Sequence, residues 1–195
     1  VFTWLTLIFV SGINLVIFFG LFSIFISILT YLIFFIERFN YIKIRIASFF
    51  NSTPSEYSQA EKASEAIIDG GFFGKGIGEG TLNSKIPEAH TDFIISVISE
   101  EFGIIIILLI MLAFIFFAFN IFKKIRDTND NIFKMILIGL ISLLLMQAFI
   151  HVGVNLRVLP TTGMTLPYLS YGGSSIISIS IISGIILNLT KRRVY

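Results

Sequence analysis

The sequence contains no cysteine, and only 13% of its 195 residues are charged. Without cysteine, disulfide bonds and thiolate metal sites are excluded. The net charge of +2 is small and scattered along the chain, so we expect no nucleic-acid partner. The sequence begins at Val1 and not at a Met, and its first ten residues are mostly apolar, with no basic residues among them. We therefore expect a fragment of a longer protein, without a secretory signal.

Hydrophobic residues, in contrast, are abundant. They make up 55% of the sequence and include 22 Phe, and the mean hydropathy is +0.92. A soluble core of this length could not bury that much apolar surface. The composition therefore predicts an integral membrane protein, built as an all-α, polytopic membrane helix bundle.

Four apolar runs are long enough to cross a hydrocarbon core of about 30 Å at about 1.5 Å per residue. They lie at about residues 15–36, 102–122, 135–154 and 174–189. Residues 1–10 are too short to span and are expected to be the end of a truncated helix. Two longer connections remain. These are a large loop at 37–91, expected to contain short helices, and a loop at 155–173.

Basic residues fix the expected orientation. Lys123, Lys124 and Arg126 follow the second span, and Lys191, Arg192 and Arg193 follow the fourth. Two crossings separate these clusters, so both lie on one side, which the positive-inside rule makes cytoplasmic. The C-terminus is then cytoplasmic, and the two long loops face outward.

The stretch from Pro87 to Gly103 holds four carboxylates and a histidine beside the second apolar run. An ionisable group at the edge of a membrane must be paired, hydrated or functional, because an unsolvated charge is costly there. A helix beginning near Thr91 would place Asp92 about 12 Å outside Glu100, on a polar face. Capping of a polar helix end by Thr91 or Asp92 explains the same residues, and spacing alone favours that interpretation.

A glycine-rich segment, residues 70–81, precedes this stretch and includes Lys75. Its backbone N–H groups could approach a phosphate or diphosphate. However, it lacks the Gly-Lys-Ser/Thr sequence and the flanking strand and helix of a nucleotide site, and Glu79 lies nearby. A tight re-entrant loop that needs glycine for its geometry is the stronger interpretation.

The second outer loop carries two prolines, Pro160 and Pro167, in a run too apolar for a solvated loop and too broken for a helix. We expect it to dip to membrane depth and to wall the same cavity as Asp92. Arg157 either neutralises a phosphate or pairs with Glu100 or Glu101. His90 could join Glu88 and Asp92 around a cation, but nothing in the spacing selects one.

Three motifs in this order carry a family resemblance. They are Pro87-Glu-Ala-His-Thr-Asp-Phe-Ile with Glu100-Glu-Phe-Gly, the upstream Gly-Gly-x-x-Gly-x-Gly-x-Gly, and Leu159-Pro-x-x-Gly-Met-Thr-Leu-Pro-x-x-Ser-Tyr-Gly-Gly-Ser-Ser. Together they resemble the SEDS family, the FtsW, RodA and SpoVE cell-wall proteins, from about residue 12 to residue 192. Asn155-Leu156 and Met164-Thr-Leu-Pro are similar to the FtsW branch.

The resemblance implies the C-terminal part of a membrane domain of about ten helices in the bacterial cytoplasmic membrane. Such a protein is a peptidoglycan glycosyltransferase that polymerises lipid II, the undecaprenyl-diphosphate-linked precursor, on the outer face during cell division. The implied partners are a class B penicillin-binding protein and other divisome proteins. This chain alone is expected to be inactive. A lipid II flippase and a non-catalytic scaffold that recruits a penicillin-binding protein are the alternatives.

The family's essential aspartate maps onto Asp92, which we expect to act as the base that takes the proton from the attacking sugar hydroxyl. The negative charge that develops on the departing diphosphate needs stabilisation by a positive charge, for which a divalent cation, Mg or Mn, on the lipid diphosphate is a candidate. No protein metal site and no certain cofactor are expected. The expected substrate-binding residues are Lys75, Glu88, His90, Thr91, Arg157, Ser170, Gly172, Gly173, Ser174 and Ser175.

Overall fold

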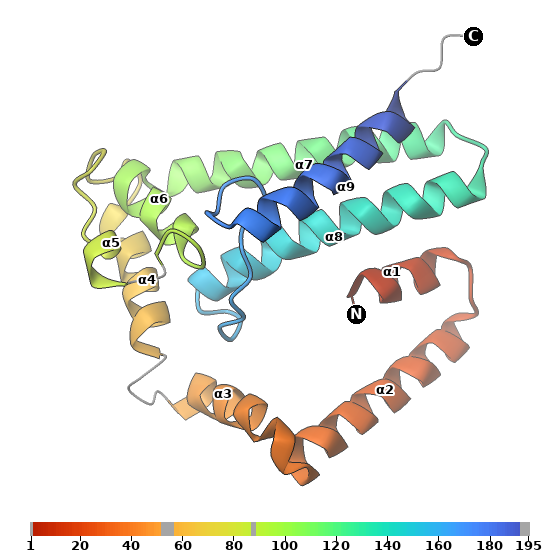
Figure 1. Cartoon of the computed structure of the whole chain (residues 1–195), viewed down its shortest axis with the longest axis horizontal. Coiled ribbons are helices and arrows are strands. Elements are labelled where there is room, and N and C mark those ends of the chain that lie inside the picture. Colours follow the sequence, from red (N-terminus) through yellow and green to blue (C-terminus); the bar gives the residue numbers. More distant parts are fainter. Residues whose placement is uncertain (1, 52–56, 87–88, 192–195) are drawn as a thin grey trace.

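The computed structural model describes residues 2–51, 57–86 and 89–191, and this part of the chain is helical and contains no strand (Figure 1). The α-helices are α1 (Phe2–Val10), α2 (Leu15–Phe35), α3 (Asn40–Asn51), α4 (Tyr57–Gly70), α5 (Leu82–Lys85), α6 (Ile94–Phe102), α7 (Ile104–Arg126), α8 (Asn131–Asn155) and α9 (Gly173–Thr190), and a 3-10 turn, η1 (Glu37–Phe39), precedes α3. The predicted all-α class, with short helices in the first long loop, is confirmed.

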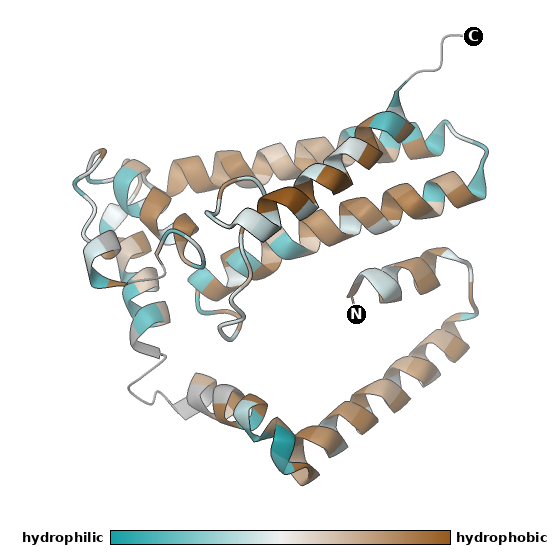
Figure 2. Cartoon of the chain, viewed as in Figure 1, coloured by the Kyte–Doolittle hydropathy of each residue, from teal (hydrophilic) through white to brown (hydrophobic). Residues whose placement is uncertain are grey.

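Four helices, α2, α7, α8 and α9, are long and apolar enough to cross a membrane. Figure 2 shows apolar residues along their whole length and polar residues gathered at their ends. Much of this apolar surface is exposed, and α2 buries none of its residues. Lipid is the solvent in which such a surface is stable. The chain is therefore a multi-pass membrane protein, and the prediction of a polytopic helix bundle is confirmed.

Helices α7, α8 and α9 form the centre of the bundle. Apolar side chains from all three pack together, among them Ile121, Ile141 and Ile179. Helix α1 lies against α8, where a Cβ atom added to Gly139 would lie 3.3 Å from the side chain of Leu7. Helices α2 and α3 lead away from this bundle (Figure 1).

Three short helices, α4, α5 and α6, lie together at the end of the bundle opposite the α7–α8 turn (Figure 1). We call them the α4–α6 unit. Three buried alanines of α4, Ala60, Ala63 and Ala66, recur on one helix face and belong to the same core as Phe93 and Val97. Because alanine side chains are short, α4 approaches α6 closely.

The sequence predicted one helix from Thr91 into the second span, and this is wrong at Gly103. Helix α6 ends at Phe102 and α7 begins at Ile104, because Gly103 adopts a left-handed backbone with φ of 84°. The amide of Ile104 donates to the carbonyl oxygen of Gly71 at 2.9 Å, so the glycine-rich segment packs against the junction between the two helices. The contact with the glycine-rich segment thus ends one helix and starts another where the sequence favoured a single helix.

The same segment satisfies the last carbonyls of α6. The amides of Lys75 and Gly76 donate to the carbonyl oxygens of Glu100 and Glu101, at 2.8 and 3.1 Å. A side chain on Gly70 or Gly74 would overlap the backbone of α6. The glycines are therefore needed for close backbone packing, and these two amides are occupied by carbonyls of the protein.

We predict that Gly103→Ala destabilises the α6–α7 junction. An added methyl group would overlap the carbonyl of Phe72 and would sit on a backbone with positive φ, so the loss should exceed about 1 kcal/mol. Gly184→Ala is the matched control, because Gly184 lies within α9 and has open space around it. Thermal unfolding in detergent should show a lower Tm for Gly103→Ala alone. Equal Tm values for the two variants would contradict the prediction.

Candidate functional site

Asp92 lies on irregular backbone just before α6, and the contacts of this backbone fix its position. The carbonyl oxygens of residues 90–92 accept three hydrogen bonds in succession. The donors are Tyr171 N at 3.1 Å, Ser170 Oγ at 2.7 Å and Asn155 Nδ2 at 3.1 Å. The segment that carries Asp92 is therefore bound on one side by residues 156–172 and on the other by the end of α8.

The two side-chain donors are themselves held in place. Ser170 is buried, and its Oγ also accepts a hydrogen bond from Leu166 N at 2.7 Å. Asn155 is fully buried, and its Oδ1 accepts from the Ser96 hydroxyl at 2.7 Å and the Ser96 amide at 3.3 Å. Each donor thus links two backbone segments, which rigidifies the surroundings of Asp92.

The Asp92 side chain is half-buried and faces Gly163. A Cβ atom added to Gly163 would lie 3.6 Å from Asp92 Oδ2. Gly163 also has a φ of 64°, a conformation that favours glycine. Glycine here therefore supplies the turn and leaves the carboxylate room beside residues 156–172.

Gly163 lines a pocket of about 380 Å³ between α8, the 156–172 segment and the start of α9. Hydroxyl and amide groups occupy much of its wall. Thr165 Oγ1 and Ser175 Oγ are 2.7 Å apart, and Gln147 Nε2 donates to the Thr165 carbonyl at 2.9 Å. The remaining polar residues of the wall are Ser174 and Ser178. This hydroxyl-lined pocket beside Asp92 is the candidate site, and it suits a polar, uncharged group such as a sugar.

Three polar side chains of helix α8, spaced four residues apart, contact the backbone of the 156–172 segment and of Asp92. Gln147 donates to the Thr165 carbonyl, His151 Nδ1 lies 2.7 Å from the Met164 carbonyl, and Asn155 donates to the Asp92 carbonyl. The sequence analysis did not propose Gln147 or Asn155 as site residues. Their spacing on one face of an apolar helix was the signal that could have found them.

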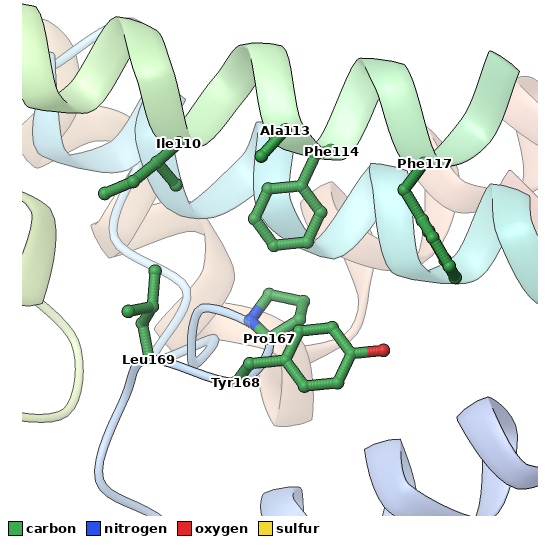
Figure 3. Close-up of a pocket in the computed structure, with 7 residues that line it drawn as sticks. All are labelled: Ile110, Ala113, Phe114, Phe117, Pro167, Tyr168 and Leu169. Carbon is green, nitrogen blue, oxygen red and sulfur yellow. The ribbon is translucent and has the colours of Figure 1, made fainter. Parts of the chain in front are cut away.

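A second pocket, of about 330 Å³, lies on the other side of the 156–172 segment, against α7 (Figure 3). The Tyr168 ring stacks on Phe114 with centroids 6.4 Å apart, and its hydroxyl lies 2.6 Å from Ser183 Oγ. Pro167 and Leu169 complete the apolar wall (Figure 3). The lining carries no carboxylate and no cationic group, so we assign no chemistry to it.

The structure brings most of the predicted site residues together. His90 and Thr91 adjoin Asp92, and Ser170 holds the Thr91 carbonyl. At the start of α9, Ser174 and Ser175 line the pocket, and Gly172 and Gly173 directly precede them. Predicted Glu88 lies outside the described residues.

Two predicted residues are engaged elsewhere. Arg157 Nη1 lies 3.3 Å from Glu61 Oε1 on α4, and its predicted partners were Glu100 and Glu101. Lys75 Nζ lies 3.0 Å from Glu100 Oε1 and 3.2 Å from Asp69 Oδ2. Glu100 is near the end of α6 and Asp92 precedes its start, so Lys75 and Asp92 are separated by on the order of 10 Å.

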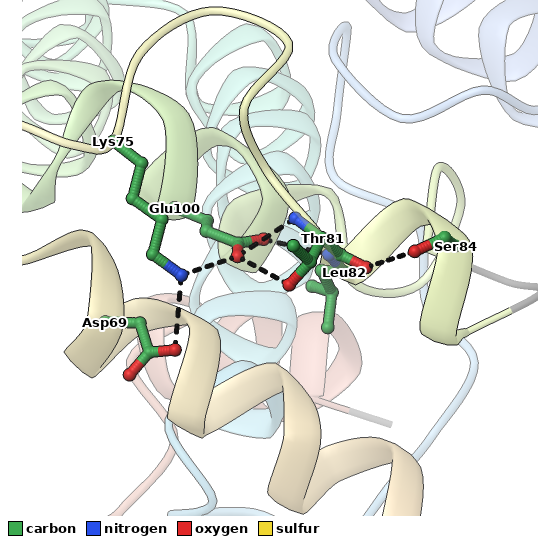
Figure 4. A network of polar contacts seen from close by, with 6 residues as sticks. All are labelled: Asp69, Lys75, Thr81, Leu82, Ser84 and Glu100. Atoms are coloured by element: carbon green, nitrogen blue, oxygen red, sulfur yellow. Dashed lines mark hydrogen bonds and ion pairs between the residues drawn. The ribbon is translucent and has the colours of Figure 1, made fainter.

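Glu100 is the centre of a buried polar network (Figure 4). Only 1% of the residue is exposed. Its Oε1 accepts from Lys75 Nζ, Thr81 N and Thr81 Oγ1 at 3.0 to 3.1 Å, and its Oε2 accepts from Leu82 N at 2.9 Å. Burial raises the pKa of the Glu100 carboxyl, but these hydrogen bonds outweigh it and lower the pKa to about 2. The hydrogen bond to Glu100 raises the pKa of Lys75 in turn.

Among the residues that the structure describes, no group of three or more His, Asp or Glu side chains is arranged to hold a metal ion. The buried carboxylate of Glu100 is already bonded to a lysine and to amides. Within the part of the chain that the structure describes, the candidate site offers the Asp92 carboxylate, hydroxyls and backbone N–H groups for chemistry.

We predict that Glu100→Gln destabilises the α4–α6 unit at pH 7 by up to about 3 kcal/mol, the equivalent of lowering the pKa from 4.5 to about 2. Because the folded pKa is the lower one, the charge stabilises fully above pH 4.5. This stabilisation is lost as the pH falls towards 2. The unfolding free energy of the parent should therefore drop across that window, and the gap to Glu100→Gln should close.

Glu101→Gln is the matched control, because the neighbouring carboxylate is half-buried on the same helix. Unfolding in detergent over a pH series, or hydrogen exchange at Thr81 and Leu82, provides the measurement. A difference between parent and Glu100→Gln that stays constant with pH would contradict the assigned charge state.

Comparisons with known proteins place the chain in a family. The family model for FTSW_RODA_SPOVE, cell cycle protein, matches residues 1–195. A probable peptidoglycan glycosyltransferase FtsW of Caulobacter vibrioides is 38% identical over 155 residues, which are 80% of this chain and 40% of the relative. The protein of that name in Nitrosomonas europaea is 35% identical over 201 residues, which cover 97% of this chain and 51% of the relative.

A solved chain from work on structural coordination of polymerization and crosslinking by a peptidoglycan synthase complex has the same fold. Its TM-score is 0.72 at 24% identity, covering 97% of this chain and 52% of that one. The chain thus spans about half or less of the length of the proteins it matches. With a family match over all its residues and these identities, the chain belongs to the FtsW/RodA/SpoVE family of cell cycle proteins.

Proposed function

We propose that the protein containing this chain is an FtsW-type peptidoglycan glycosyltransferase that polymerises lipid II into glycan strands during cell division. Its relatives are named probable peptidoglycan glycosyltransferase FtsW, which supports the reaction. One observation carries the assignment of the site. The backbone that carries Asp92 is fixed by three hydrogen bonds to the carbonyl oxygens of residues 90–92, and the Asp92 carboxylate faces Gly163, which lines a pocket with several hydroxyl groups.

In the proposed reaction, a sugar hydroxyl of one substrate attacks the anomeric carbon of another. The hydroxyl proton passes to the Asp92 carboxylate as the new glycosidic C–O bond forms. The C–O bond to the lipid diphosphate breaks, and the diphosphate leaves with the electron pair. A single displacement with one base inverts the anomeric centre and needs no second carboxylate as nucleophile.

The start of α9 is the part of this chain best suited to the leaving diphosphate. The first N–H groups of a helix point out of its N-terminus, where the helix dipole favours negative charge. Gly173 has open space where a side chain would be, so a phosphate oxygen can approach the backbone of Gly172, Gly173, Ser174 and Ser175. His90, Thr91 and Ser170 would contact or orient the sugar beside Asp92.

Neutralisation of the diphosphate must come largely from outside the residues of this site. Lys75 and Arg157 are paired with Glu100 and Glu61, so we assign them secondary roles in substrate binding. A divalent cation, Mg or Mn, carried on the diphosphate would supply the missing positive charge. The activity also requires the rest of the protein, because this chain spans only part of its relatives.

The proposed location is the bacterial cytoplasmic membrane, with the C-terminus on the cytoplasmic side. Lys123, Lys124 and Arg126 end α7, and Lys191 follows α9 at the same end of the bundle. The positive-inside rule makes this end cytoplasmic and places the candidate site at the outer face. The proposed partners are a class B penicillin-binding protein and other divisome proteins. The peptidoglycan synthase complex of the structural neighbour supports the first of them.

We predict that Asp92→Asn in the full-length protein lowers glycan polymerisation at least about 100-fold, because the amide cannot take up the hydroxyl proton. Asp127→Asn is the matched control, since Asp127 is an exposed aspartate at the opposite end of α7. The measurement is polymer formed from labelled lipid II by the purified protein with its penicillin-binding partner.

Two other functions are distinguished by the same experiment. Undiminished polymer from Asp92→Asn would remove Asp92 as the base. Lipid II translocation across vesicles without polymer, from the parent protein, would favour a flippase. Complex formation with neither activity would favour a scaffold.

A further inference from the structure

Four large apolar side chains are exposed beside the glycine-rich segment. Phe72 and Phe73 are 72% and 84% exposed, and Ile68 and Ile77 are 77% and 79% exposed. Two adjacent phenylalanines in water are unfavourable, because each leaves a large apolar ring uncovered. This cluster, residues 68, 72, 73 and 77, therefore needs a covering surface.

The backbone contacts place the two rings at the edge of the membrane. Gly71 O accepts from Ile104 N, the first amide of α7, at 2.9 Å, and the Phe72 carbonyl lies against Gly103. From Ile104 to Phe122 the helix is apolar except for Asn120, and these residues span about 28 Å, which matches the hydrocarbon thickness. This length puts Ile104 at the expected hydrocarbon boundary, and the backbone of Phe72 and Phe73 lies beside it.

The backbone of Phe72 lies against Gly103, which stands between two further exposed apolar residues. Phe102 and Ile105, on either side of the helix break, are 43% and 40% exposed. Phe102 lies just before the membrane-spanning helix α7, and Ile105 lies in its first turn, where the exposed side chains are apolar. Phenylalanine is among the residues that interfacial segments bury at the boundary between headgroups and acyl chains.

We propose that Phe72 and Phe73 insert into the leaflet at the α7 N-terminus and anchor the α4–α6 unit to the membrane. The occupant of this surface is the boundary between headgroups and acyl chains. The anchor is coupled to α6 through the amides of Lys75 and Gly76, which bond to its last carbonyls. Because Asp92 precedes the same helix, the anchor sets the depth of Asp92 relative to the membrane. This last consequence alone rests on the proposed function.

Tryptophan fluorescence tests the insertion directly. Trp4 is the only tryptophan in this sequence, so Phe73→Trp combined with Trp4→Phe adds a reporter at the cluster. The protein is reconstituted in vesicles of phosphatidylethanolamine and phosphatidylglycerol, with a fraction of the lipid brominated either near the headgroup or near the bilayer centre. The Trp4→Phe protein supplies the background signal.

We expect blue-shifted emission from the new tryptophan and at least twofold stronger quenching by the shallow bromine than by the deep one. Glu65→Trp in the same background is the control, because Glu65 is an exposed, charged position on α4. It should emit as a hydrated tryptophan and respond to acrylamide.

Emission of a hydrated tryptophan at residue 73, with no quenching by brominated lipid, would overturn the proposal. A blue shift that arises only when a penicillin-binding partner is added would also overturn it, because the cluster would then be a protein contact. Gel filtration of each variant confirms that the fold is retained before the spectra are compared.

Discussion

Irregular backbone in a membrane protein must have its polar groups satisfied by the protein, and the candidate site is built on that constraint. The segment before α6 leaves the helix hydrogen-bonding pattern, so its carbonyls need donors from elsewhere. Tyr171, Ser170 and Asn155 supply one donor each to residues 90–92. The same bonds that satisfy the backbone also fix the position from which the Asp92 side chain faces Gly163, so the stability of this region and the geometry of its site are inseparable.

Some charged residues near the site hold the fold together, and Asp92 is the one to which we assign chemistry. Glu100 is buried and ionised because a lysine, a hydroxyl and two amides bind it, which locks the glycine-rich segment onto the end of α6. Arg157 joins α4 to the end of α8 through Glu61. Asp92 is half-buried, and its carboxylate faces Gly163, which lines the pocket. A reaction that releases a diphosphate therefore has to draw most of its positive charge from outside this chain or from a cation on the substrate.

The glycine pattern of residues 70–81 is compatible with two structures, and only the contacts with α6 distinguish them. One is an anion site and the other is a tight re-entrant loop. The structure supports the tight loop, because Gly70 and Gly74 lie against the α6 backbone and the amides of Lys75 and Gly76 bond to α6 carbonyls. The same contacts explain why α6 and α7 are separate helices. No local pattern signals that break, since Gly103 is a single glycine beside a long apolar run.

By itself, the sequence determined the membrane class, the all-α fold and the family, because long apolar runs and fixed motifs are properties of the chain that need no partner. It also pointed to Asp92 and to the 160–175 residues as neighbours. Only the tertiary structure decided which side chains hold that aspartate, why the helix breaks at Gly103, and that Lys75 and Arg157 pair away from the site. The physical reason is that hydrogen bonds and ion pairs between residues 25 to 96 positions apart depend on three-dimensional packing, which spacing along one helix or loop does not encode.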